Sequence, residues 1–153
     1  MDEFRTRRSP RMGGFDYRTA ASYFVTICAH NMECIFGPPN CLNAFGQIAR
    51  QEIGQMEKYH PWIEVFHSVV MPNHVHMIIS IYEENQKSLS EIVGNYKAGV
   101  SRRIHIVQPE RLVWQRSFHD HMIRTKREWD LIWQYISDNP KRWEMDQFFR
   151  KIL

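Results

Sequence analysis

The segment from Pro61 to Tyr82 most constrains what this chain can fold into. It holds two runs rich in β-branched and aromatic residues, PWIEVFHSVV (61–70) and HVHMIISIY (74–82), separated by MPN. Runs of this length and composition predict strands, and so short a connection joins them only as an antiparallel hairpin. A lone hairpin is marginal in water, so other elements must cover its apolar side chains.

The segments around the hairpin alternate between strand and helix patterns. Strand patterns occupy residues 22–30 and 118–124, and helix patterns occupy residues 42–59, 87–106 and 126–139. Ser88 or Ser90 can cap the second helix. Pro140 should end the third helix at Asn139, because a residue before proline is biased away from α geometry.

This order, β-α-β-β-α-β followed by a helix, predicts an α+β sandwich. Two helices would cover one face of an antiparallel sheet and leave the other face free to carry a site. The chain has 153 residues, 43% of them apolar, which suits one domain with a proper core. We expect a basic arm at residues 1–16 and a single domain at residues 17–153.

The composition also bounds the compartment. No apolar run approaches the roughly 18 residues that cross a bilayer, and the N-terminal MDEFRTRRSPRMGG lacks an apolar signal-peptide centre. We therefore expect a cytoplasmic protein with no membrane partner. Cys28, Cys34 and Cys41 are odd in number and show no paired spacing, which is typical of reduced thiols.

Positive charge is distributed unevenly along the chain. The net charge is only +3, but residues 97–127 hold eight basic residues against two acidic ones, and arginines crowd the N-terminus. Such a local excess can bind phosphate groups, although a solvated helix face explains the same pattern. The candidate nucleic-acid contacts are Arg7, Arg8 and Arg11 in the arm, Lys97 and Arg102 on the second helix, and Arg124.

Two histidines lie one residue apart in the second strand of the hairpin. His74 and His76 should project from the same face about 7 Å apart, with Val75 pointing into the core. We expect the pair to face solvent and to be able to converge on one divalent ion. His119 and His121 repeat the spacing, and four histidines could form a zinc site. The residues alone leave open whether one pair, the other or both bind metal.

The third helix has two distinct faces. Apolar residues with helical spacing form a core stripe at Trp129, Ile132, Trp133 and Ile136. Tyr135 and Asn139 are four residues apart and share a different face. They would present a phenol and an amide together at the helix end, although a packing role for the tyrosine is the ordinary alternative.

Three segments taken in order, MPNHVHMII, WQRSFHDHMIR and YISDNPKRW, resemble a known family. The chain is most similar to the REP-associated tyrosine transposase branch of the single-tyrosine transposases, within the HUH endonuclease superfamily. The resemblance extends from about Tyr17 to Trp143. It implies a ferredoxin-like (RRM-like) sandwich whose C-terminal helix carries the nucleophile. It gives the second histidine pair no role as metal ligands, and His121 joins the candidate DNA contacts.

The resemblance also implies roles for residues of the first pair and of the third helix. His74, His76 and Asn139 would bind a divalent metal, magnesium or manganese, and Tyr135 would be the nucleophile. The implied enzyme cleaves and rejoins single-stranded or hairpin DNA through a 5′-phosphotyrosine. Tyr96, beside Lys97, is the runner-up nucleophile.

Other interpretations are a non-catalytic nucleic-acid-binding module that uses exposed aromatic residues on the sheet, or a small zinc protein that uses both histidine pairs. The target sequence and the choice between monomer and homodimer stay open at this point.

Overall fold

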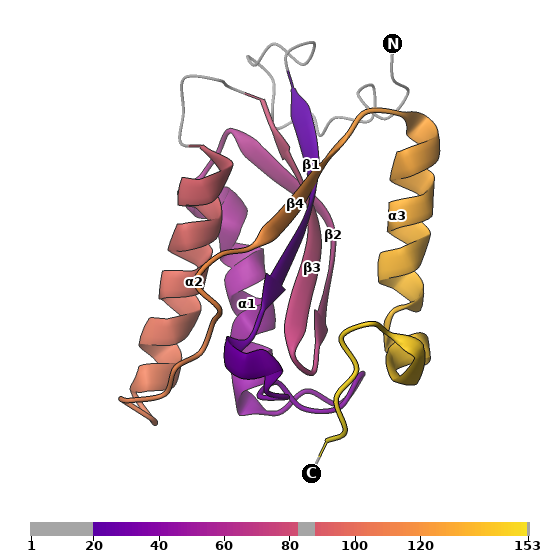
Figure 1. The fold of residues 1–153 in the computed structure, drawn as a ribbon. Coiled ribbons are helices and arrows are strands. Elements are labelled where there is room, and N and C mark those ends of the chain that lie inside the picture. The colour runs from indigo at the N-terminus through magenta and orange to yellow at the C-terminus, as the bar shows by residue number, and fades with distance from the viewer. Residues whose placement is uncertain (1–19, 83–87, 153) are drawn as a thin grey trace.

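A computed structural model of the chain describes residues 20–82 and 88–152. Its strands are β1 (Ala21–Cys28), β2 (Ile63–Met71), β3 (His74–Ile81) and β4 (His119–Ile123). They form one sheet in the order β2-β3-β1-β4, with every neighbouring pair antiparallel. Its helices are α1 (Ala44–Tyr59), α2 (Leu89–His105) and α3 (Lys126–Asp138), with 3-10 turns η4 (His30–Met32) and η5 (Pro140–Met145). The expected α+β, ferredoxin-like sandwich is confirmed (Figure 1).

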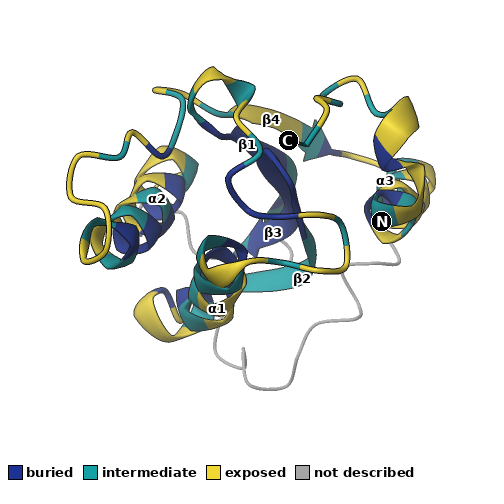
Figure 2. Cartoon of the chain, turned by 90° about the horizontal axis from the view of Figure 1, so that it is seen from below, coloured by how far each residue is buried: buried dark blue, intermediate teal, exposed yellow. Residues whose placement is uncertain are grey.

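The helices lie on both faces of the sheet. α1 and α2 cover one face and α3 stands on the other (Figures 1 and 2). Alternation along β1 explains the division, because Val25 and Ile27 belong to the larger core beneath α1 and α2, whereas Phe24 packs against the smaller cluster under α3. That smaller cluster contains Ile78 from β3 and Trp129 and Ile136 from α3. Part of the expected apolar stripe of α3 is therefore buried against the sheet.

Each long helix begins at a side chain that caps it. Asn43 accepts a hydrogen bond from the Gly46 N–H, and Thr125 accepts one from the Glu128 N–H. Ser88 caps α2 as predicted and forms a reciprocal capping box with Glu91. Such caps satisfy N–H groups that the helix itself leaves without partners.

The end of α3 differs from the expectation at one residue. Helix α3 does end before Pro140, but Asn139 keeps helical angles of φ −53° and ψ −47°. The chain passes directly into η5, so proline at the first position of that turn takes the place of a break. As a result Asn139 stays in line with α3, and its side chain keeps the helical relation to Tyr135.

The remaining expectations concern the N-terminal arm, the three cysteines and membrane-spanning helices. The arm with Arg7, Arg8 and Arg11 lies outside the described residues. Cys28, Cys34 and Cys41 are free cysteines, as expected. Among the residues that the structure describes, no helix is long and apolar enough to cross a membrane.

Two glycines of α1 make a matched test of this packing. A Cβ on Gly46 would lie 2.3 Å from the Phe36 carbonyl oxygen and 2.9 Å from the Leu42 Cβ, whereas a Cβ on Gly54 would have no neighbour within 4 Å. Gly46→Ala should therefore destabilise the protein by about 1–3 kcal/mol. Gly54→Ala should stabilise it by about 0.5–1 kcal/mol, because alanine favours the helix. Urea unfolding of both variants checks the pair, and equal effects would contradict the close approach at Gly46.

Candidate functional site

His74 and His76 lie on the sheet face that α3 covers. Their ring centroids are 4.5 Å apart, which confirms that the two side chains share a face. The expectation that they face solvent was wrong, since the exposed fractions are 0% and 1%. Three rings from later in the chain account for this burial. Phe148 and Trp143 lie 4.7 and 6.3 Å from His74, and Tyr135 lies 5.4 Å from His76.

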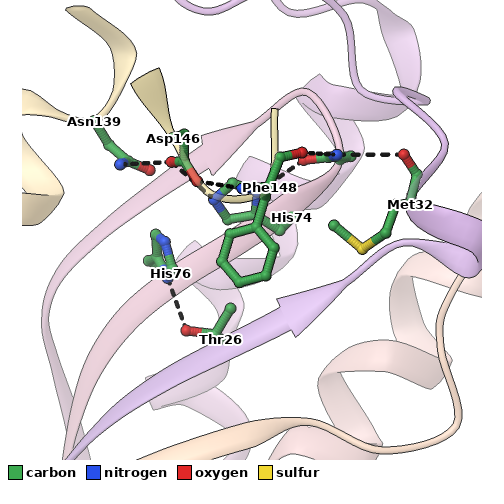
Figure 3. Close-up of polar contacts among 8 residues, drawn as sticks. Thr26, Met32, His74, His76, Asn139, Asp146 and Phe148 are labelled. Atoms are coloured by element: carbon green, nitrogen blue, oxygen red, sulfur yellow. Dashed lines mark hydrogen bonds and ion pairs between the residues drawn. The ribbon is translucent and has the colours of Figure 1, made fainter. Parts of the chain in front are cut away.

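The Nδ1 atom of His74 is fixed by a chain of hydrogen bonds (Figure 3). The amide nitrogen of Asn73 donates to the carbonyl oxygens of Met32 and Phe148, at 3.2 and 2.7 Å. Carbonyl oxygens only accept, so the amide oxygen must face His74, whose Nδ1 lies 2.8 Å away. Nδ1 therefore carries the proton, and the lone pair of the neutral ring is on Nε2.

His76 is held in a similar way. Its Nδ1 lies 2.9 Å from the Thr26 Oγ1 of the neighbouring strand β1. A hydrogen bond with the Val25 backbone also stabilises the protonated ring, although burial outweighs it. The Nδ1 atoms of His74 and His76 are thus both hydrogen-bonded. Their Nε2 atoms are buried with no hydrogen-bond partner in the described part of the chain.

Asn139 brings a third atom of this kind to the site. It caps the C-terminal end of α3, is 3% exposed, and donates from Nδ2 to the Asp146 Oδ2 at 3.0 Å. Its Oδ1 is buried and finds no partner among the described residues. Asp146 also lies 3.9 Å from the His74 Nε2. Neither Asp146 nor Phe148 carries a signal in the sequence, because the segment after Pro140 shows no regular period.

Burial keeps both imidazoles neutral. It lowers the pKa of His74 to about 4, although the Asp146 charge and the neighbouring Asn139 amide act in the opposite direction. The pKa of His76 is also lowered, by burial first and then by His74. At neutral pH each ring is therefore neutral, with one N–H and one lone pair, and in His74 the Asn73 contact places that lone pair on Nε2.

Tyr135 stands over this group on α3. Its ring makes edge contacts with Phe24 at 6.1 Å and with His76 at 5.4 Å, and it is 37% exposed. It borders a pocket of about 320 Å³, lined also by Asp138, Asn139, Arg142, Met145 and Asp146. Burial and the Asp146 charge raise the pKa of Tyr135, while the Asn139 side chain lowers it. The hydroxyl is therefore protonated at neutral pH and needs activation to act as a nucleophile.

The unpaired atoms fit a divalent cation. Two imidazole nitrogens and one amide oxygen are common ligands of such ions, and each would otherwise be buried without a partner. Within residues 20–82 and 88–152, no group of three or more His, Cys, Asp and Glu side chains could hold a metal. A site built from these described atoms would use the amide oxygen of Asn139 beside the two imidazoles.

The second histidine pair does not join the first. In the sheet register Thr26 of β1 pairs with His76 on one side and with His119 on the other. Two strand spacings, about 10 Å, therefore separate the pairs. His119 and His121 are exposed, and the His121 Nε2 lies 2.9 Å from the Glu128 Oε2. The four-histidine zinc site was a wrong interpretation.

The remaining candidates fall on different faces. Lys97 and Arg102 lie on α2, on the opposite side of the sheet from Tyr135 (Figure 1). The Lys97 ammonium donates to the Gln115 carbonyl oxygen at 2.6 Å, so at least one of its three N–H donors is already used. His121 and exposed Arg124 lie on or just after β4, on the edge of the sheet next to β1.

The structure argues against two rival interpretations, Tyr96 as the nucleophile and a sheet with exposed aromatic residues that stack on bases. Tyr96 is 3% exposed, donates its hydroxyl to the Ala49 carbonyl oxygen at 3.0 Å, and has a pKa raised by burial and by Glu52. It is not available as a nucleophile. Phe24 on a central strand lies against the rings of His76 and Tyr135, so it is not a free platform for bases.

Known proteins resemble this chain in sequence and in fold. The family model described as "Transposase IS200 like" matches residues 41–139, which span both histidines, Tyr135 and Asn139. An uncharacterized protein of Haemophilus influenzae is 33% identical over 167 residues, covering 94% of this chain and 93% of the relative.

Two solved structures share the fold. A REP-associated tyrosine transposase bound to a REP hairpin superposes with a TM-score of 0.62 and 21% identity, covering 80% of this chain and 67% of that one. A putative transposase from Deinococcus radiodurans gives a TM-score of 0.53 and 18% identity, covering 82% and 93%. Since the family model covers well over half of its length, the chain belongs to the IS200-like transposases, a family of DNA-processing enzymes.

Proposed function

We propose that this chain is a metal-dependent transposase that cleaves and rejoins single-stranded DNA through an ester on Tyr135. The observation that carries the proposal is that Tyr135 lies beside a group of three buried ligand-type atoms that have no hydrogen-bond partner among the described residues. The ring of Tyr135 contacts that of His76, and Asn139 follows it by one helical turn. A packing tyrosine would not require unpaired nitrogen and oxygen atoms beneath it.

The reaction we propose is a transesterification. The Tyr135 oxygen attacks a backbone phosphorus in line with the bond to the 3′-oxygen, and that bond breaks. The products are a 5′-phosphotyrosine and a free 3′-hydroxyl, which takes up one proton as the phenol loses one. The ester keeps the energy of the phosphodiester, so a 3′-hydroxyl can reverse the attack and rejoin DNA without ATP.

The residues of the site divide the work between binding and attack. His74, His76 and Asn139 would hold a divalent cation, which when bound polarises a non-bridging oxygen of the scissile phosphate. Magnesium and manganese both suit phosphate, and two imidazole ligands favour manganese of the two. Phe24 and His76 fix the tyrosine ring by edge contacts, so its hydroxyl approaches from one direction.

The partner we propose is single-stranded or hairpin DNA. The similar solved transposase is bound to a REP hairpin. In this chain His121 of β4 pairs with Phe24, whose ring contacts Tyr135, and Arg142 lines the same pocket as Tyr135. His121 and Arg124 would contact the strand beside Tyr135. Lys97, Arg102 and the arginines of the arm at residues 1–16 would contact more distant phosphates.

Metal binding should stabilise the fold. Manganese at about 100 times its dissociation constant adds ~2.7 kcal/mol, which raises the melting temperature of a domain of this size by about 5–10 °C. His76→Ala should abolish this shift, because it removes a ligand, whereas His119→Ala should retain it. Differential scanning calorimetry measures both, and a shift that depends on His119 instead would place the metal elsewhere.

The nucleophile assignment is tested by removing one oxygen atom. Tyr135→Phe keeps the ring contacts with Phe24 and His76, so folding and DNA affinity should change little. Covalent attachment to hairpin DNA in the presence of manganese should disappear. Tyr59→Phe, at a tyrosine that is 66% exposed on α1, is the control and should form the adduct normally. Denaturing gels and mass spectrometry report the adduct, and its persistence in Tyr135→Phe would refute the assignment.

The strand contact near β4 can be measured by salt dependence. Arg124→Ala should weaken binding to single-stranded DNA and reduce the slope of log affinity against log salt by roughly 0.7, the value for one lost phosphate contact. Arg50→Ala is the matched control, because Arg50 is exposed on α1, on the other side of the sheet. Equal slopes for Arg124→Ala and the unaltered chain would exclude this contact.

A further inference from the structure

The amide of Asn139 has two chemically different ends. Its oxygen can ligate a cation, but its NH₂ group is a donor and cannot. A rotation of about 180° around the last bond exchanges the two ends with almost no change in shape. The proposed metal site therefore requires a neighbouring group that distinguishes the amide oxygen from the amide nitrogen. That group must contact the end of the amide that faces away from the imidazoles.

Asp146 meets that requirement (Figure 3). Its carboxylate only accepts hydrogen bonds, and its Oδ2 takes one from the Asn139 Nδ2 at 3.0 Å. A rotated amide would place Oδ1 against the carboxylate and lose this bond. The Phe148 N–H donates to the other carboxylate oxygen, the Asp146 Oδ1, at 2.8 Å. The Asp146 side chain is 1% exposed. The carboxylate is thus held in place and cannot turn away.

We infer that Asp146 is a positioning residue, which orients the Asn139 oxygen toward the imidazoles of His74 and His76. This inference rests on the proposed metal site. Each oxygen of Asp146 already accepts a hydrogen bond. The Asp146 Oδ2 lies 3.9 Å from the His74 Nε2, and we place this carboxylate behind Asn139 rather than among the ligands beside the two histidines.

The first test variant is Asp146→Asn. An asparagine at position 146 offers one accepting oxygen to two donors, the Asn139 amide and the Phe148 N–H. When that oxygen serves Phe148, its NH₂ faces Asn139 and draws the Asn139 oxygen away from the imidazoles. Manganese affinity should fall by about 10–100-fold, the usual loss when an outer partner of a ligand is changed. The free-manganese signal in electron paramagnetic resonance measures it.

The second variant exchanges the two residues. In N139D/D146N, the carboxylate at position 139 has no donor end, so one of its oxygens faces the imidazoles in either rotation. The amide at position 146 can donate to the other oxygen, and the net charge equals that of the unaltered chain. This exchange should restore manganese affinity to within about threefold of the original, since the orienting contact is no longer needed.

Controls separate orientation from charge and from folding. Asp130→Asn removes one negative charge from α3, where Asp130 pairs with Lys126, and it should leave manganese affinity unchanged. Thermal unfolding in EDTA shows that each variant folds without metal. A loss of affinity in Asp146→Asn that the exchange restores is not expected of a residue that only holds the C-terminal segment.

The outcomes distinguish this inference from the function on which it rests. If the unaltered chain binds no manganese, or His76→Ala binds it equally well, the metal site itself is wrong and the inference falls with it. If the site is sound but Asp146→Asn binds as tightly as the unaltered chain, Asp146 orients nothing. If N139D/D146N binds as weakly as Asp146→Asn, then Asp146 is a direct ligand or a structural residue, and the positioning role is refuted.

Discussion

Three ligand-type atoms that are buried with no hydrogen-bond partner among residues 20–82 and 88–152 form the constraint on which the rest of the site depends. Leaving one buried polar atom unsatisfied costs about 1–3 kcal/mol, so the Nε2 atoms of His74 and His76 and the Oδ1 of Asn139 together cost several. The other polar atom of each side chain is hydrogen-bonded: the two Nδ1 atoms to Asn73 and Thr26, and the Asn139 Nδ2 to Asp146. The fold thus satisfies these groups at one end and keeps the other end open, as a prepared ligand site requires.

Segments far apart in the sequence produce this arrangement through a few shared contacts. The β2–β3 turn supplies Asn73, whose single amide connects η4 through Met32, the C-terminal segment through Phe148, and the proposed ligand His74. Because both N–H groups of the Asn73 side chain are already used, a displacement of any of these three segments would disturb the contact that sets the tautomer of His74. The position of the C-terminal segment is therefore linked to the readiness of the site, although it lies about 75 residues from the turn.

Sequence reasoning found the parts of the site that depend on local periodicity. Strand alternation placed His74 and His76 on one face, and helical spacing placed Tyr135 one turn from Asn139. It could not find what covers them, because alternation identifies a face of a sheet and not the segment that packs on it. Asp146 and Phe148 lie in a tail without regular period, and their roles arise only from contacts with β3 and α3. The burial of the histidines was mispredicted for the same reason.

Placing the proposed nucleophile and a proposed metal ligand on one helix has a mechanical consequence. A helical turn fixes the separation of Tyr135 and Asn139, so the two can move relative to the histidines only if α3 itself shifts.

Both ends of α3 are held by hydrogen bonds. At its start Glu128 accepts hydrogen bonds from the Arg124 N–H at 2.8 Å and pairs with His121 of β4, and at its end Asn139 is bonded to Asp146. Between these points Trp129 and Ile136 are buried against Ile78 of the sheet. The direction of the proposed attack would therefore be set by the packing of a helix on a sheet, which resists small displacements better than a loop would.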